Sequence, residues 1–318
     1  MHPAEQPRKY TDLAIIARQS MEDWPLTLQR FVHEFGAMNP VDAAQIAAKT
    51  VMDRYAAAYP YNDRDAISVR YLCKLLDIDL RGNVPKMLPS RSNPRFGSYG
   101  ESDDRPAAAL LVFNRRATID VAAPNPLRAR ISVAHEIGHF LIHSRGQEID
   151  NSMMHSEVTT EEEILSEYIG RLLLLPTELF HFQFTRQRSM AVACITAARD
   201  AAVSFNIATS RISDPDQALP SLKGAIFWRL VPGSPTHLPV EKRLAPFWHL
   251  CPNAFVPIRK CHARHDSVIA KVASSNARAS ATAMEDVEIG SFRGRFAVDA
   301  FAWGSISAKT RTVLSLFM

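Results

Sequence analysis

The chain has 318 residues, of which 47% are hydrophobic and 22% charged, and its net charge is +4. These values are typical of an ordinary soluble protein that can bury a sizeable core. The small positive charge gives no reason to expect nucleic-acid binding, and no apolar run reaches the ~18–20 residues that a membrane span requires.

The first residues and the cysteines bear on the compartment. Residues 1–12 lack the apolar core of a signal peptide. The four cysteines are sparse and irregularly spaced: Cys73, Cys194, Cys251 and Cys261. We therefore expect reduced thiols and a cytoplasmic location, with no membrane association.

The first third of the chain has the pattern of helices followed by a long loop. Apolar residues recur at helical spacing in residues 10–24 and 40–59, with prolines as breaks between them. Residues 66–76 predict a further short helix. Residues 89–106 are polar and rich in Ser, Gly and Pro, which predicts a long loop.

Two strands and two strong helices are expected next. Residues 107–114 and 116–123 have strand composition, and they form either a hairpin or one strand with a bend. Pro126 then opens a helix that continues to about His143. A second helix spans residues 160–175, where Pro176 ends it. Shorter helices follow, including residues 189–206 and 208–213.

The composition changes near residues 215–221, beyond which strands dominate. Strand patterns occur at residues 224–231, 255–260 and 287–304, and the Ala/Ser-rich residues 272–283 predict a flexible loop. We therefore divide the chain into three parts. They are an N-terminal helical segment (residues 1–39), a central domain (40–218) and a β-rich C-terminal domain with a sensor or docking role (219–318).

The helix at residues 126–143 contains the sequence HEIGH at positions 135–139. His135 and His139 lie one turn apart on the same face, so both imidazoles can bind a single zinc ion. Glu136 lies about 100° around the helix, where it can reach a metal-held water as general base. The alternative is a buried amphipathic helix whose histidines are satisfied within the core, although an unpaired Glu136 would be costly there.

A catalytic zinc usually has three protein ligands, and the next helix offers acidic residues. Thr160 with Glu163 forms a capping box, which would give Glu163 a local role. Thr159 with Glu162 forms an equally good box, which leaves Glu163 for the metal. We therefore favour Glu163 as the third ligand, with Glu162 and Glu167 as alternatives.

Glu163, Glu167 and Gly170 share one stripe of this second helix. Glu167 could then accept a hydrogen bond from the far nitrogen of a ligand histidine and fix its tautomer. Gly170 and Gly138 would allow the two helices to approach each other closely.

Residues 130–143 (RISVAHEIGHFLIH) and 162–176 (EEILSEYIGRLLLLP) together resemble the ImmA/IrrE family of zinc metallopeptidases. Glu163 and Pro176 match the second family motif, from which five other positions depart: Ser166, Glu167, Ile169, Gly170 and Leu175. The resemblance covers about residues 40–215. It implies an α+β fold with a thermolysin-like, mini-gluzincin core, with His135, His139 and Glu163 as zinc ligands and Glu136 as general base.

The resemblance also implies a function. Several members of the family act as intracellular endopeptidases that cut a helix-turn-helix repressor and thereby switch on phage, mobile-element or stress genes. The competing hypothesis is a non-catalytic, metal-binding regulator of the same fold that binds a repressor or DNA. Since Arg211 alone supplies positive charge in residues 201–213, we expect no direct DNA binding.

Several supporting roles remain open. An oxyanion donor could be His143, His155 or Tyr168. The strand at residues 117–123 could hold an extended substrate by main-chain hydrogen bonds. A second zinc site at Cys251, Cys261, His262 and His265 is not expected, because these residues contain no C-x-x-C pair.

Overall fold

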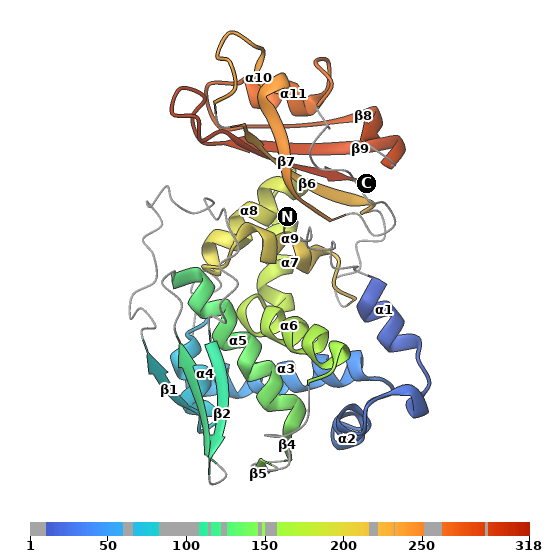
Figure 1. The fold of residues 1–318 in the computed structure, drawn as a ribbon, viewed down its shortest axis with the longest axis vertical. Helices are drawn as coiled ribbons and strands as arrows, with labels where there is room; N and C mark the ends of the chain where they lie inside the picture. The colour runs from blue at the N-terminus through green and yellow to red at the C-terminus, as the bar shows by residue number, and fades with distance from the viewer. Residues whose placement is uncertain are drawn as a thin grey trace. The chain divides into compact units, whose positions relative to one another are not determined.

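The structure is a computed structural model. It describes residues 11–59, 66–82, 108–113, 116–121, 126–145, 148–149, 158–215, 222–231, 233–250, 263–289 and 292–318. The chain divides into two compact units. The N-terminal unit comprises Asp12–Phe182 and Ala197–Gln217, and the C-terminal unit is built mainly from Gln183–Thr196 and Ala218–Met318. Helices and sheets are both present, which confirms the α+β class (Figure 1).

The helices up to residue 215 are α1 (Thr11–Arg18), the 3-10 helix η1 (Met21–Asp23), α2 (Leu26–Glu34), α3 (Pro40–Ala58), α4 (Val69–Leu75), α5 (Pro126–His143), α6 (Thr160–Leu174), α7 (Thr177–Arg186), α8 (Met190–Asp200) and α9 (Phe205–Ile212). The helices predicted at residues 40–59, 126–143 and 160–175 are confirmed to within one residue at each end. The expected helix at residues 189–206 is shorter than predicted. The backbone turns at Ala202, with a φ of 50°, and Ser204 caps a new helix by accepting a hydrogen bond from the Ile207 N–H.

A small sheet lies beside α5 in the N-terminal unit. Its strands are β1 (Asp79–Gly82), β2 (Ala108–Phe113) and β3 (Arg116–Val121), in the order β1-β3-β2. β2 and β3 pair antiparallel, so the two predicted strands form a hairpin, whereas β1 and β3 are parallel. β3 is therefore the central strand and β2 an edge. Two short strands, β4 (Ser144–Arg145) and β5 (Glu148–Ile149), follow α5.

The C-terminal unit contains a five-stranded antiparallel sheet in the order β7-β6-β10-β9-β8. Its elements are β6 (Gly224–Leu230), α10 (Val240–Arg243), β7 (Leu244–Leu250), α11 (Val268–Ser274), β8 (Ala279–Ile289), β9 (Phe292–Trp303) and β10 (Thr312–Phe317). Its core joins Ile269 and Val272 of α11 to sheet residues such as Trp228 and Val298.

The loop predicted at residues 272–283 is wrong. α11 continues to Ser274 and β8 begins at Ala279. Ala279, Ala281 and Ala283 pack against the core cluster while the residues between them are exposed, so small side chains hid the two-residue alternation of a strand. The strand predicted at residues 255–260 lies outside the described residues.

None of the helices in the described part of the chain combines the length and the apolar character that a membrane crossing requires.

Candidate metal centre

Helices α5 and α6 approach each other through two glycines. A Cβ atom placed on Gly138 would lie 2.5 Å from the backbone oxygen of Ser166. A Cβ on Gly170 would lie 3.1 Å from the backbone nitrogen of His135. The close approach expected from these two glycines is therefore confirmed, and at position 138 only glycine fits without a shift of one helix.

This packing brings the three predicted ligands together. The Nε2 atoms of His135 and His139 lie 3.1 Å apart. The carboxylate of Glu163 lies 3.2 Å from His135 Nε2 through Oε2, and 3.5 Å from His139 Nε2 through Oε1. The three residues form a cluster whose possible ligand atoms all lie within 4.8 Å of one another.

The dimensions of the cluster fit a zinc ion. Zinc binds histidine nitrogen at ~2.0–2.1 Å with tetrahedral geometry, which places neighbouring ligand atoms about 3.3 Å apart. The three edges of the observed triangle, 3.1, 3.2 and 3.5 Å, lie close to that value. The side chain of Glu163 is 54% exposed and that of His139 10%, so solvent reaches the cluster from the carboxylate side.

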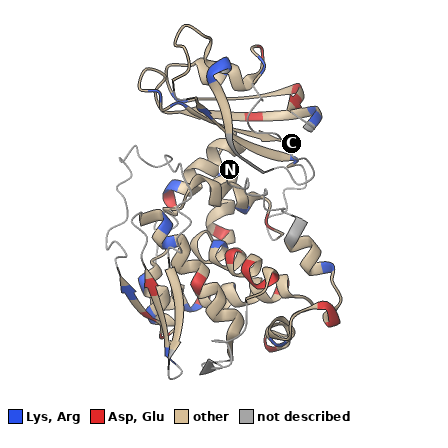
Figure 2. Ribbon diagram, in the orientation of Figure 1, with Lys and Arg blue, Asp and Glu red and all other residues tan. Residues whose placement is uncertain are grey.

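The start of α6 shows why Glu163 and not Glu162 reaches the cluster. Acidic residues occupy the whole first turn (Figure 2). Thr159 and Glu162 form the capping box: Thr159 Oγ1 accepts a hydrogen bond from the Glu162 N–H, and Glu162 Oε2 accepts one from the Thr159 N–H. Glu162 is buried, and its carboxylate is held in the capping box at the start of α6. Glu163 takes no part in this capping box.

Glu136 lies between the cluster and the small sheet. Its Oε2 accepts a hydrogen bond of 3.0 Å from the backbone N–H of Leu110 on β2. Burial raises the pKa of the Glu136 carboxyl above its usual range, and the negative charge of Glu163 adds to this, although His135 and the Leu110 N–H act in the opposite direction. A half-buried carboxylate with a raised pKa is suited to accept and release a proton.

The two cluster histidines have different proton affinities. Burial lowers the pKa of His135, but its hydrogen bond to Glu163 and the charges of Glu136 and Glu163 outweigh burial, so the net shift is upward. Burial, together with the charge of His135, lowers the pKa of His139 to about 4. His139 therefore keeps a neutral imidazole for a metal over a wide pH range.

The hydrogen bond expected from Glu167 to a ligand histidine stays a prediction for His135. Glu167 Oε1 lies 3.3 Å from Nη1 of Arg171, one turn further along α6. Arg171 is itself held by Asp214, with Nη2 to Oδ1 at 2.7 Å and Nε to Oδ2 at 3.0 Å. Among the described residues, the buried Nδ1 of His139 has no hydrogen-bond partner.

The sequence reasoning missed the pair of Arg171 and Asp214. The available signal was an arginine next to an apolar run, where a buried guanidinium requires an acidic partner. Nothing in the sequence identifies the partner, because it lies 43 positions away.

The three residues predicted as possible oxyanion donors differ in their surroundings. Tyr168 is fully buried, and its hydroxyl accepts a hydrogen bond from Gln45 Nε2, so it is not available to a substrate in this structure. His143 is buried with its Nε2 3.9 Å from Glu162, and burial lowers its pKa. His155 lies outside the described residues.

The second zinc site that the sequence does not favour falls mostly outside the described residues. Of its four residues only His265 is described, and it is exposed. The thiols of Cys73 and Cys194 are buried, and burial raises the pKa of Cys73 to about 12. Arg211 is fully buried and donates hydrogen bonds to the Leu175 carbonyl and to Thr177, so its guanidinium does not face a nucleic acid.

Comparison with known proteins agrees with the family resemblance. Residues 114–213, which include the whole cluster, match the IrrE N-terminal-like domain. This family is one of peptidases, and the match supports the resemblance to the ImmA/IrrE type.

Two further comparisons add no functional argument. No curated protein matches the chain. A solved structure of a Mycobacterium tuberculosis transcriptional regulator is similar over 92% of this chain and 81% of its own, with 12% identity and a TM-score of 0.42. A likeness at this level carries no conclusion about the present chain.

Proposed function

We propose that the chain is a zinc-dependent endopeptidase with a thermolysin-like catalytic core. The observation that supports the proposal is the triangle of His135 Nε2, His139 Nε2 and the Glu163 carboxylate, with the half-buried Glu136 beside His135 on α5. Its edges suit the tetrahedral coordination of zinc. The match of residues 114–213 to a peptidase family supports the proposal.

Each residue then has a defined role. His135, His139 and Glu163 hold Zn²⁺, which when bound polarises a peptide carbonyl and makes water more acidic. Glu136 takes the proton of the attacking water and passes it to the leaving amine. The Leu110 N–H holds Oε2 of Glu136, which leaves the other carboxylate oxygen to receive that proton.

The substrate would bind along β2 and not along the strand at residues 117–123. β3 is paired with β2 along its whole length and with β1 at residues 118–121, so over these four residues it has no main-chain groups for a substrate. β2 is an edge, and its Leu110 N–H points toward Glu136. Strand geometry gives Ala108 and Val112 the same edge-facing orientation as Leu110. An extended peptide at this edge would lie beside Glu136.

The substrate that we propose is a helix-turn-helix repressor in the cytoplasm, so that cleavage regulates transcription. This follows from the family resemblance, and the buried reduced thiols are compatible with that compartment. In chain order, the helical segment 1–39 would be followed by the catalytic domain, residues 40–218. Residues 219–318 would serve in sensing or docking.

Glu136→Gln tests the proposal, because it removes the base and keeps the size of the side chain. The purified protein and the variant are compared for zinc content and for cleavage of a candidate repressor, read by mass spectrometry. Both should bind one zinc, and the variant should cleave ~10²–10⁴-fold more slowly. Equal cleavage by both proteins would overturn the proposal. Zinc and repressor binding with no cleavage by either would identify the non-catalytic regulator.

A further inference from the structure

β8 forms one edge of the five-stranded sheet. It pairs with β9 along its whole length of eleven residues, from Ala279 opposite Ala302 to Ile289 opposite Phe292. Within the described residues, no strand pairs with its other side. β8 therefore presents a long row of backbone N–H and C=O groups without a strand partner.

The pairing of Ile289 with Phe292 determines which backbone groups face this edge. Two residues separate them, so they exchange both hydrogen bonds as the closing pair of a hairpin. The odd-numbered residues of β8 then bond to β9, and the backbone groups of Met284, Asp286 and Glu288 point away from it. None of these three N–H groups has a hydrogen-bond partner in the described parts of the chain.

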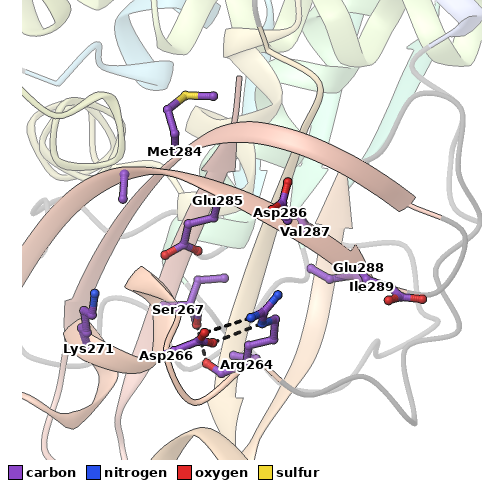
Figure 3. Close-up of a pocket in the computed structure, with 13 residues that line it drawn as sticks. Arg264, Asp266, Ser267, Lys271, Met284, Glu285, Asp286, Val287, Glu288 and Ile289 are labelled. Atoms are coloured by element: carbon purple, nitrogen blue, oxygen red, sulfur yellow. Dashed lines mark hydrogen bonds and ion pairs between the residues drawn. The ribbon is translucent and has the colours of Figure 1, made fainter.

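A groove of about 330 Å³ follows the same edge (Figure 3). Residues 283–289 of β8 line one side, and residues from the segment 263–271, at and before α11, line the other. Successive side chains of a strand point to opposite faces, so seven consecutive residues line one groove only where it follows the strand edge. We call this feature the β8 groove.

The opposite edge of the sheet is protected in a way that β8 is not. β7 contains Pro246, and its register with β6 shifts between Phe227 and Trp228. Proline and irregular pairing both disfavour the addition of another strand. β8 contains no proline, and its register with β9 is unbroken.

Charged residues line the β8 groove, with four carboxylates against two cations. They are Asp266, Glu285, Asp286 and Glu288, with Arg264 and Lys271. Three of these four carboxylates form an ion pair or accept a hydrogen bond. Asp266 pairs with Arg264 at 2.9 Å, Glu288 pairs with Arg293 at 3.0 Å, and Glu285 accepts a hydrogen bond from the Val268 N–H.

Asp286 differs from the other three. It forms no ion pair among the described residues, although Arg295 lies opposite it on β9, and it is exposed at a position whose own N–H faces the open edge. The lining of the groove therefore combines unpaired main-chain groups with more carboxylates than cations.

We propose that the β8 groove binds an extended, basic segment of a protein partner, which adds to the sheet as a further strand. Main-chain hydrogen bonds to Met284, Asp286 and Glu288 hold the segment, and a lysine or arginine of the segment lies against Asp286. The proposal is independent of zinc and of cleavage, since every residue that carries it lies in the C-terminal unit.

The test is selection of random ten-residue peptides, displayed on phage, against the full-length protein. Met284→Pro removes one edge-facing N–H without breaking the ladder to β9. Asp286→Lys reverses the charge at this position. Glu178→Lys, at an exposed acidic position of α7, is the matched control. Affinities of the selected peptides are measured by fluorescence anisotropy.

The natural sequence and Glu178→Lys should select peptides with lysine or arginine at alternate positions. Asp286→Lys should weaken these peptides at least tenfold and select acidic ones instead, and Met284→Pro should weaken both kinds. The proposal is overturned if no extended basic peptide is selected, or if Asp286→Lys binds such peptides unchanged. It is also overturned if the protein is a dimer that Asp286→Lys or Met284→Pro converts to a monomer, because a second copy would then occupy the edge.

Discussion

At the scale of single residues, the proposed zinc site depends most on Glu163, because this residue supplies the one ligand from outside the HEIGH sequence. Glu163→Ala should weaken zinc binding by at least 100-fold, since two histidines alone leave the ion with too few protein ligands. Competition with a chromophoric chelator measures the change. Glu161→Ala, in the same turn of α6, is the matched control and should bind zinc as the natural protein does. Unchanged zinc affinity in Glu163→Ala would contradict the assignment.

The two histidines predict how zinc binding depends on pH. A ligand histidine must be neutral to bind, so protons compete with the metal below its pKa. The pKa of His135 lies above 6.5 and that of His139 at about 4. Between pH 6.5 and about 4 only His135 is protonated, so log Kd should rise by about one for each unit of falling pH. A chelator titration that gives a slope near two would contradict this difference between the histidines.

At the scale of helices and strands, Gly138 is the critical contact between α5 and α6. Alanine normally favours a helix over glycine by about 1 kcal/mol. Here its Cβ would lie 2.5 Å from Ser166 O, a backbone atom of a packed helix that cannot turn away. We expect Gly138→Ala to lower the free energy of unfolding by about 1–3 kcal/mol in urea denaturation, and to weaken zinc binding. Gly170→Ala, with a contact of 3.1 Å, should cost less, and the reverse order would contradict the packing.

The link between α6 and the end of α9 should contribute strongly to stability. Asp214 is fully buried and pairs with both Arg171 and Arg211. Asp214→Ala leaves two buried guanidinium groups without their carboxylate, so the free energy of unfolding should fall by about 3–5 kcal/mol. Arg171→Met keeps the pair of Asp214 with Arg211 and should cost less. Thermal unfolding of the metal-free proteins checks this order, and equal stability of Asp214→Ala and the natural protein would refute it.

How much the sequence could predict depends on the distance between the residues involved. The spacing of His135, Glu136 and His139 is local and was predictable from helix geometry. The sequence offered a capping box at Thr159 and another at Thr160, and the structure selects Thr159. Whether β2 or β3 lies beside Glu136 depends on the order of the strands in the sheet. The amino-acid composition of a strand does not reveal that order. The partner of Arg171 is 43 positions away, and the alternation of β8 is hidden by alanines, so neither could be predicted from local pattern.

At the scale of the whole molecule, zinc should stabilise one unit and leave the other unchanged. All three proposed ligands lie in the N-terminal unit. Binding to the folded state alone adds about 2.7 kcal/mol at a free zinc concentration 100 times Kd. Hydrogen–deuterium exchange with mass spectrometry should therefore show zinc-dependent protection in α5 and α6, and none in β6–β10. Protection of both units, or protection that persists in Glu163→Ala, would show that zinc acts elsewhere.

The central claim is that two histidines and one glutamate from α5 and α6 hold a single zinc ion. Crystals grown with zinc and measured on both sides of the zinc absorption edge test it most directly. The account predicts one strong anomalous peak ~2.0–2.2 Å from His135 Nε2, His139 Nε2 and a Glu163 oxygen. A map in which these three side chains are ordered and no peak lies among them would contradict it.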